Sequence, residues 1–230
     1  MPNRREILRA SLAAAGLAAI GPVLSPALAA EDAAVASVTR MTEAFQEALK
    51  RPDVTGRAAV LSGPMAQSFD LPAMLRLAVG TRWKDIPAAK QTALVEAFGP
   101  YLTATYATRL SAATGARFTV QPKSEPRGSG RLVRSTVTEA SGEESPVDYV
   151  TNAEGRITDV YLQGTVSEAG TLRTNFGEQL KSGGPDALLE FLRKTTATML
   201  AAPPPPAPAT PASTTSAPAT PDKPAADAKP

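Results

Sequence analysis

The chain has 230 residues, of which 24 are basic and 22 acidic, and it contains neither cysteine nor histidine. This composition excludes disulfides, thiol or imidazole catalysis and the usual zinc sites, and nothing in it calls for a cofactor. Between residues 31 and 202 basic and acidic side chains are equal in number, so this region lacks the cationic surplus that nucleic-acid binding requires. Oxygen-ligand metal sites and unusual serine, lysine or tyrosine chemistry remain open.

Residues 1–30 have the pattern of an export signal. Arg4 and Arg5 precede a run rich in alanine and leucine, and small residues follow, so we expect cleavage near Ala29 or Ala30. The paired arginines resemble the twin-arginine export pattern, which leaves that route and general secretion both open. Glycines and prolines interrupt the run, which argues against an uncleaved spanning helix. We therefore expect a soluble mature protein in the periplasm.

Residues 203–230 form a Pro/Ala-rich tail that holds ten of the 22 prolines and no bulky apolar side chain. Such a segment cannot bury enough surface to offset the entropy of ordering it, so we expect disorder. The tail is either a tether or a tolerated solubilising extension.

Residues 31–202 are the predicted domain, and their hydrophobic periodicity changes twice. Helical spacing comes first, gives way to a period near two from residue 116, and returns at residue 169. The predicted helices lie within 41–49, 56–65, 72–79, 87–110, 169–180 and 185–199, and the predicted strands at 116–122, 131–140, 146–152 and 156–163. Short turn-like segments join the strands, as in an antiparallel meander. The order predicts an α+β fold with N-terminal helices, a four-stranded antiparallel sheet and C-terminal helices.

No catalytic constellation stands out in this domain. Asp148 and Asp159 lie on adjacent predicted strands and could converge, but no basic residue beside them in the sequence would orient them. We therefore predict that the protein is not an enzyme. An enzyme that uses these carboxylates, Tyr149 or Tyr161 as acid or base stays open as an alternative, and so does a non-catalytic adaptor with a filled core.

Two ordered sets of residues resemble the MlaC family, also called the toluene-tolerance or phospholipid-binding family. The first begins at Ser68-Phe69-Asp70-Leu71-Pro72-Ala73-Met74 and continues to Leu110. The second begins at Tyr161-Leu162-Gln163-Gly164-Thr165-Val166-Ser167 and continues through Gly183-Gly184-Pro185 to Leu192. Both starting stretches are most similar to the HpnM branch of the family, which is associated with hopanoid biosynthesis gene clusters.

The resemblance implies a periplasmic lipid carrier, an auxiliary component of an ABC transporter that maintains outer-membrane lipid asymmetry. Its ligand would be a phospholipid or a hopanoid, held in an apolar cavity between sheet and helices. It would be a monomer that makes transient contacts with inner-membrane and outer-membrane lipid-transport complexes. The cavity candidates are apolar and aromatic side chains on the predicted elements: Phe69, Met74, Leu75, Val79, Trp83, Phe98, Leu102, Tyr106, Phe118, Val133, Val137, Tyr149 and Tyr161.

Overall fold

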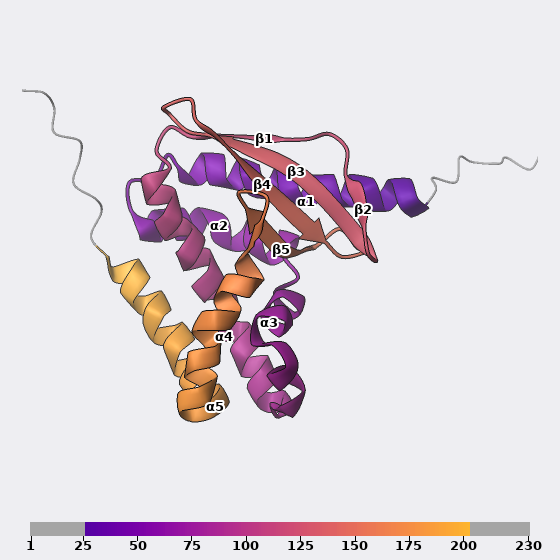
Figure 1. The fold of residues 1–230 in the computed structure, drawn as a ribbon. Coiled ribbons are helices and arrows are strands. Elements are labelled where there is room, and N and C mark those ends of the chain that lie inside the picture. Colours follow the sequence, from indigo (N-terminus) through magenta and orange to yellow (C-terminus); the bar gives the residue numbers. More distant parts are fainter. Residues whose placement is uncertain (1–25, 203–230) are drawn as a thin grey trace, which may run out of the picture.

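The computed structural model describes residues 26–202 (Figure 1). The predicted export signal up to residue 25 and the predicted tail from residue 203 lie outside the described residues, so neither prediction is tested. The helices are α1 (Pro26–Ala48), α2 (Val54–Ser68), α3 (Leu71–Val79), η1 (Gly80–Asp85), α4 (Ala88–Arg109), η2 (Leu110–Ala112) and α5 (Glu168–Ala201). The strands are β1 (Arg117–Val120), β2 (Glu125–Arg127), β3 (Gly130–Thr138), β4 (Glu144–Thr151), β5 (Ile157–Leu162) and β6 (Val166–Ser167). The predicted α+β fold is confirmed.

Short oxygen-bearing side chains start three of the helices. Asp53 accepts a hydrogen bond from the backbone N–H of Gly56 at 2.7 Å at the start of α2, and Asp70 accepts one from Ala73 at 3.0 Å at the start of α3. Ser167 does the same for α5. These caps satisfy backbone donors that a helix leaves free in its first turn, which is why the helices begin where they do.

The sheet is an antiparallel meander in the order β1-β3-β4-β5-β6, with β2 paired to the other end of β3. Short β2 and β6 were not predicted. Strand β2 has only three residues, one of them Pro126, and β6 has only two. Segments this short cannot show the alternation of apolar and polar residues by which a strand is predicted.

The register decides which side chains share a face of the sheet. Val133, Tyr149 and Val160 are direct partners across β3, β4 and β5. All three are buried. The row one position along the strands consists of Arg134, Asp148 and Tyr161. Its side chains point to the opposite face, because side chains alternate along a strand.

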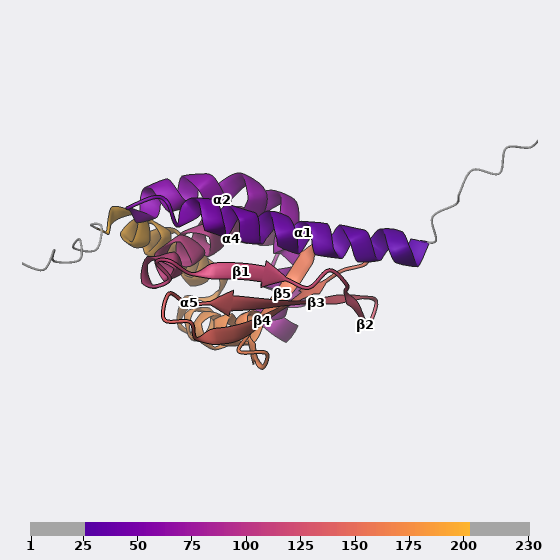
Figure 2. The same ribbon diagram turned by 90° about the horizontal axis from the view of Figure 1, so that it is seen from above.

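Helices cover the face that carries the buried row. Figure 2 shows α1 lying along the strands on one side of the sheet, with α2 next to it, and α1 contacts β1 and β3. In Figure 1, α3, α5 and part of α4 extend below the sheet. Helix α5 breaks at Gly183 and Gly184, as predicted, so its second half folds back along the first.

Aromatic side chains form two separate clusters in this arrangement. In the helical part, Phe98, Tyr101, Phe176 and Phe191 meet with ring centroids 5.8–6.3 Å apart. Between helices and sheet, Tyr106 of α4 lies against Phe45 of α1 and Phe69, which follows α2. Helix α4 thus contributes to both clusters, with its C-terminal end next to the sheet.

The turn before β5 lets α1 approach the sheet closely. Gly155 has φ +78°, and a Cβ atom there would lie 2.6 Å from the backbone carbonyl carbon of Ala33. Only glycine avoids both the left-handed strain and the clash.

We therefore expect Gly155→Ala to destabilise the protein more than Gly142→Ala. Gly142 has φ +89°, but a Cβ atom at this position would have no neighbour within 4 Å, so its substitution carries the backbone strain alone. The additional clash at Gly155 should lower the free energy of unfolding by about 1–3 kcal/mol more. Urea denaturation of both variants measures the difference. Equal midpoints would show that α1 shifts to accommodate the added methyl group without loss of stability.

Candidate functional site

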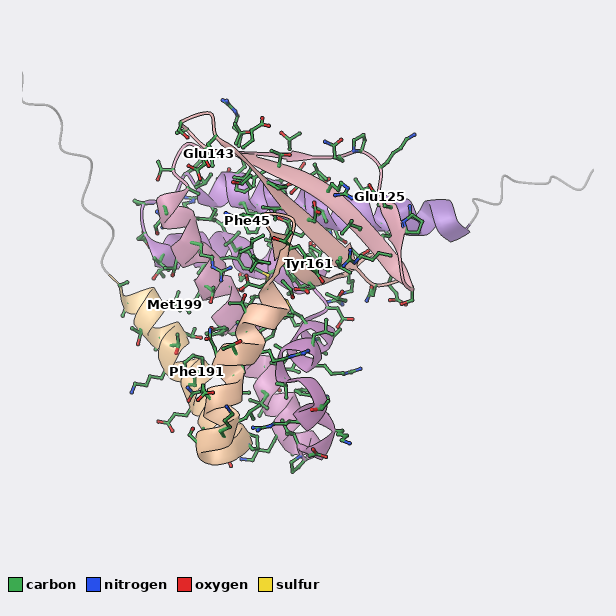
Figure 3. The ribbon with its side chains drawn as sticks, viewed as in Figure 1. Phe45, Glu125, Glu143, Tyr161, Phe191 and Met199 are labelled. Carbon is green, nitrogen blue, oxygen red and sulfur yellow. The ribbon has the colours of Figure 1, made fainter. Side chains whose placement is uncertain are left out.

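An apolar pocket of about 160 Å³ lies between α1, the C-terminal end of α4 and the inner face of the sheet. Five of its residues come from the helical side: Phe45, Tyr106, Arg109, Leu110 and Ala113. Six come from four strands: Phe118, Val137, Val147, Tyr149, Val160 and Leu162. Phe45 lies inside the fold, whereas Glu125 and Glu143 lie towards the ends of the strands (Figure 3).

Alternation along the strands brings these side chains together. Val147 and Tyr149 are two apart on β4, and Val160 and Leu162 are two apart on β5, so each pair faces the same side. Phe118 on β1 lies directly opposite Val137 on β3. The strands therefore present a continuous apolar surface to the helices.

Aromatic side chains pack against one another along one side of the pocket. The rings of Phe45 and Tyr106 stack with centroids 5.4 Å apart, and Phe45 and Phe118 lie 5.5 Å apart. Phe69 packs on the Tyr106 ring at 6.1 Å. Contacts of this kind favour a fixed mutual geometry in addition to the area they bury.

Tyr106 carries a buried hydroxyl with no partner. The residue is 8% exposed, and no atom of the described residues forms a hydrogen bond with its Oη. Burial raises the pKa of Tyr106 well above its usual value, and the Glu168 carboxylate raises it further, so the hydroxyl keeps its proton. An unsatisfied buried hydroxyl costs about 1–3 kcal/mol, and its retention at this position therefore needs an explanation.

An ion pair with one buried partner stands beside this tyrosine. The Arg109 guanidinium donates to both carboxylate oxygens of Glu168 at 2.7 and 2.9 Å and lies 5.7 Å from the centroid of the Tyr106 ring. The Glu168 side chain is 1% exposed and that of Arg109 42%. Arg109 ends α4 and Glu168 begins α5, so both charges also interact favourably with the helix dipoles.

Asp159 connects the start of α5 to β5. One of its carboxylate oxygens accepts from the backbone N–H of Ala169 at 3.0 Å, and the other accepts from the Ser167 hydroxyl at 2.6 Å. Asp148 instead faces Arg134, 3.4 Å away on the neighbouring strand, a basic partner that adjacency in the sequence does not reveal. Both carboxylates are thus engaged in structural contacts.

The two tyrosines of the enzyme alternative do not share a site with each other. Tyr149 lines the pocket, whereas Tyr161 lies in the row of the opposite face, with the Arg127 guanidinium 5.1 Å from its ring centroid. The four residues named for acid or base chemistry therefore do not form one constellation.

Four of the thirteen predicted cavity residues line the pocket together: Tyr106, Phe118, Val137 and Tyr149. Phe69 and Val133 are buried next to it, Phe69 against the Tyr106 ring and Val133 opposite Tyr149. Six others belong to the helical part, with Trp83 half-buried and the rest buried: Met74, Leu75, Val79, Trp83, Phe98 and Leu102. Tyr161 is on the far side of the sheet. A ligand-binding role for any of the thirteen stays a prediction.

Seven lining residues were missed by sequence analysis: Phe45, Arg109, Leu110, Ala113, Val147, Val160 and Leu162. Phe45 stands in the stripe of the first predicted helix, and Val147 stands two positions before Tyr149. Helical spacing and strand alternation could therefore have indicated both. Arg109 carries no such signal, because its role depends on Glu168, 59 positions away.

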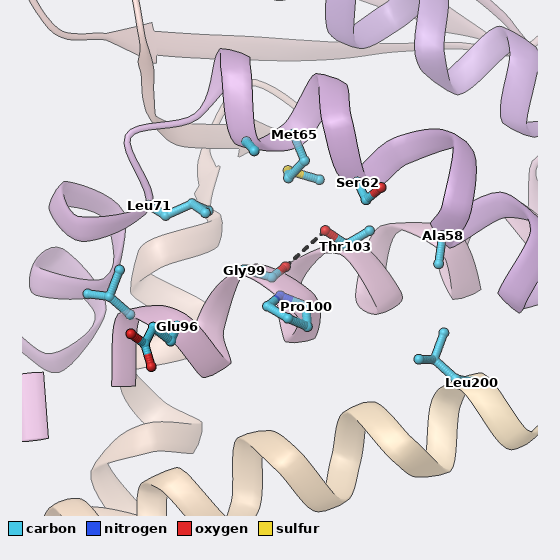
Figure 4. A pocket seen from close by; sticks show the side chains of 11 residues that line it. Ala58, Ser62, Met65, Leu71, Glu96, Gly99, Pro100, Thr103 and Leu200 are labelled. Atoms are coloured by element: carbon cyan, nitrogen blue, oxygen red, sulfur yellow. Dashed lines mark hydrogen bonds between the residues drawn. The ribbon is translucent and has the colours of Figure 1, made fainter. Parts of the chain in front are cut away.

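A second, wider groove of about 440 Å³ lies in the helical part (Figure 4). Its walls are Ala58, Ser62, Met65 and Ala66 of α2, Leu71 of α3, Val95, Glu96, Gly99, Pro100 and Thr103 of α4, and Leu200 of α5. The Thr103 hydroxyl donates to the Gly99 carbonyl oxygen at 2.9 Å, a bond internal to α4. None of the predicted cavity residues lines this groove.

Among residues 26–202 no helix combines the length and apolar character needed to cross a bilayer. Within the same range no group of three or more acidic residues is placed to hold a metal ion.

Comparison with known proteins identifies a matching sequence family and solved structures of similar fold. The sequence model of the family described as MlaC protein matches residues 36–194. Among solved structures, the phospholipid-binding protein from Ralstonia solanacearum, determined in complex with a phospholipid, has a TM-score of 0.59 and 22% sequence identity. The similarity covers 72% of this chain and 98% of that one. No curated protein shows significant sequence similarity to this chain.

The ion pair at the pocket rim should respond asymmetrically to truncation. Arg109→Ala leaves the buried Glu168 carboxylate uncompensated and should lower the free energy of unfolding by about 3 kcal/mol. Glu168→Ala leaves an arginine that water can reach, so the loss should be about 1 kcal/mol. Chemical denaturation checks both, and a larger loss for Glu168→Ala would contradict the assignment of the buried partner.

Proposed function

Because this chain belongs to the MlaC family, we propose that it is a periplasmic lipid carrier whose pocket between helices and sheet holds the apolar part of a phospholipid. It would carry that lipid between inner-membrane and outer-membrane complexes through transient contacts. The observation that carries the proposal is the apolar pocket itself, built from α1, α4 and four strands of the sheet. The phospholipid bound to the Ralstonia solanacearum protein of the same fold supports the choice of ligand.

Apolar walls are sufficient for this function. Transfer of a chain of about 16 methylenes out of water is favourable by roughly 12 kcal/mol, at about 0.8 kcal/mol each. Binding on this scale needs no catalytic group. It agrees with a pocket lined almost wholly by carbon atoms and with carboxylates engaged elsewhere. We accordingly propose a binding protein and not an enzyme.

The size of the pocket implies that the fold opens to take its ligand. Its volume of about 160 Å³ is close to that of an engineered cavity of about 150 Å³ that accommodates a single benzene molecule. A whole acyl chain therefore requires α1 to separate from the sheet, and a membrane partner could drive release by favouring the open conformation.

A hopanoid is the alternative ligand. A rigid polycyclic ring system would require α1 to separate widely from the sheet in a single step. A flexible acyl chain can enter segment by segment, and this difference favours the phospholipid. The stretches of sequence that resemble the HpnM branch support the hopanoid as a ligand.

The two ends of the chain also have roles in the proposed function. An export signal over residues 1–30 would deliver the protein to the periplasm, and the mature chain would consist of the lipid-binding domain over 31–202 and the Pro/Ala-rich tail over 203–230. Cleavage near Ala29 or Ala30 would remove the first four or five described residues of α1. The near-neutral domain fits a monomer.

Native mass spectrometry of the mature protein, purified from its own periplasm, tests the ligand directly. We expect one phospholipid per chain, identified after organic extraction. A stoichiometric hopanoid would replace the phospholipid as cargo. A bare protein that also takes up no added lipid would contradict the carrier and leave the adaptor with a filled core.

Val137→Phe tests the location of the ligand. A larger ring at this half-buried position on the inner face should fill the pocket and lower lipid occupancy about tenfold. Thr136→Phe is the matched control, because Thr136 is the adjacent residue on the opposite face. Equal occupancy in the two variants would show that the lipid lies outside this pocket.

A further inference from the structure

We propose that the Tyr106 hydroxyl donates a hydrogen bond to an ester carbonyl oxygen of the bound lipid, so that the protein selects ester-linked acyl lipids. The inference rests on the proposed function and specifies the chemical class of the ligand. It makes Tyr106 a specificity-determining residue in a pocket lined almost wholly by carbon atoms.

The unpartnered hydroxyl is the starting observation. Tyr106 lines the pocket, its Oη is buried, and no described residue accepts its proton. The other tyrosine in the lining, Tyr149, differs because its hydroxyl interacts with the Ser135 side chain. Tyr106 therefore has donor capacity that the fold leaves unused.

In the closed pocket, neighbouring side chains surround the Tyr106 ring. It is stacked on Phe45 at 5.4 Å and bounded by Phe69 at 6.1 Å, with the Arg109 guanidinium 5.7 Å from its centroid. Arg109 is itself fixed by two hydrogen bonds to Glu168. Because Oη is buried, a partner reaches it only when the pocket opens, as the proposed function requires.

A water molecule is a poor candidate for that partner. A buried water is held by two to four polar groups, and the pocket offers carbon atoms on nearly every side. A lipid brings an acceptor of its own, because ester carbonyl oxygens stand where the acyl chains join the glycerol. A hydrocarbon chain or an all-carbon ring system brings none.

The charges around the pocket point to the ester and not to the phosphate. Tyr106 remains a neutral donor, since burial and the nearby Glu168 and Asp159 carboxylates raise its pKa and outweigh the opposing effect of Arg109. Arg109 is the cation in the lining, and its charge is compensated by Glu168. A neutral acceptor such as an ester carbonyl suits this environment.

The test compares diacyl and dialkyl phosphatidylglycerol with identical chain lengths, so that only the carbonyl oxygens differ. The delipidated mature protein is titrated with vesicles of each lipid, and bound lipid is quantified by native mass spectrometry. We expect the unmodified protein to prefer the diacyl lipid about fivefold, as one hydrogen bond implies. Tyr106→Phe should reduce that ratio to about one.

Tyr101→Phe is the matched control. Tyr101 lies on the same helix and is also buried, but it belongs to the helical cluster, and its hydroxyl interacts with Thr105. This variant should keep the diacyl preference. Thermal unfolding completes the comparison: Tyr106→Phe removes an unsatisfied hydroxyl and should unfold at no lower temperature than the unmodified protein, so that a changed ratio cannot reflect loss of the fold.

The outcomes separate the two proposals. If both lipids bind and Tyr106→Phe leaves their ratio unchanged, or if the unmodified protein shows no preference, the hydrogen bond is wrong while the carrier stands. If neither lipid binds the unmodified protein, both are wrong. A hopanoid with a hydrocarbon ring system should bind Tyr106→Phe at least as well as the unmodified protein.

Discussion

The ion pair between Arg109 and Glu168 determines the geometry on which the pocket depends. It joins the last turn of α4 to the first turn of α5, while Asp159 holds that same turn of α5 against β5. One small set of charged contacts therefore sets the distance between α4 and the sheet. Because Glu168 is almost fully buried, these contacts have little freedom to exchange with water.

The helical part and the region next to the sheet, which meet at these contacts between α4, α5 and β5, are packed differently. In the helical part, the rings of Phe98, Tyr101, Phe176 and Phe191 pack against one another, and the wider groove lies between the helices. Towards the sheet, α1 covers an apolar face and leaves a pocket at the end of α4. Separation of α1 from the sheet would open this pocket while the helical cluster stays intact. Such a motion would combine a firm support with one mobile wall, as the proposed carrier requires for release of its lipid.

The α+β order could be predicted because helical and strand periods differ and each long element carries several repeats. Strands β2 and β6 could not, since two or three residues contain no period. The candidate site was harder still. Tyr149 and Tyr161 look equivalent in an alternating sequence, and only the strand register places them on opposite faces. Likewise Leu102 and Tyr106 share a helix, but only Tyr106 lines the pocket next to the sheet.

The unpaired Tyr106 hydroxyl was invisible to sequence analysis for a related reason. A tyrosine at helical spacing is most often ordinary core, and its lack of a hydrogen-bond partner depends on which side chains surround it in space. The family resemblance implied Tyr106 as a cavity candidate, whereas burial and the missing partner suggest what it could do there.

A crystal structure of the mature protein with its co-purified lipid would test the central claim most directly. The account predicts an acyl chain between Phe45, Phe118 and Tyr149, with α1 displaced from the sheet to admit it. A lipid in the wider groove between α2, α4 and α5, with the pocket next to the sheet unchanged, would contradict it.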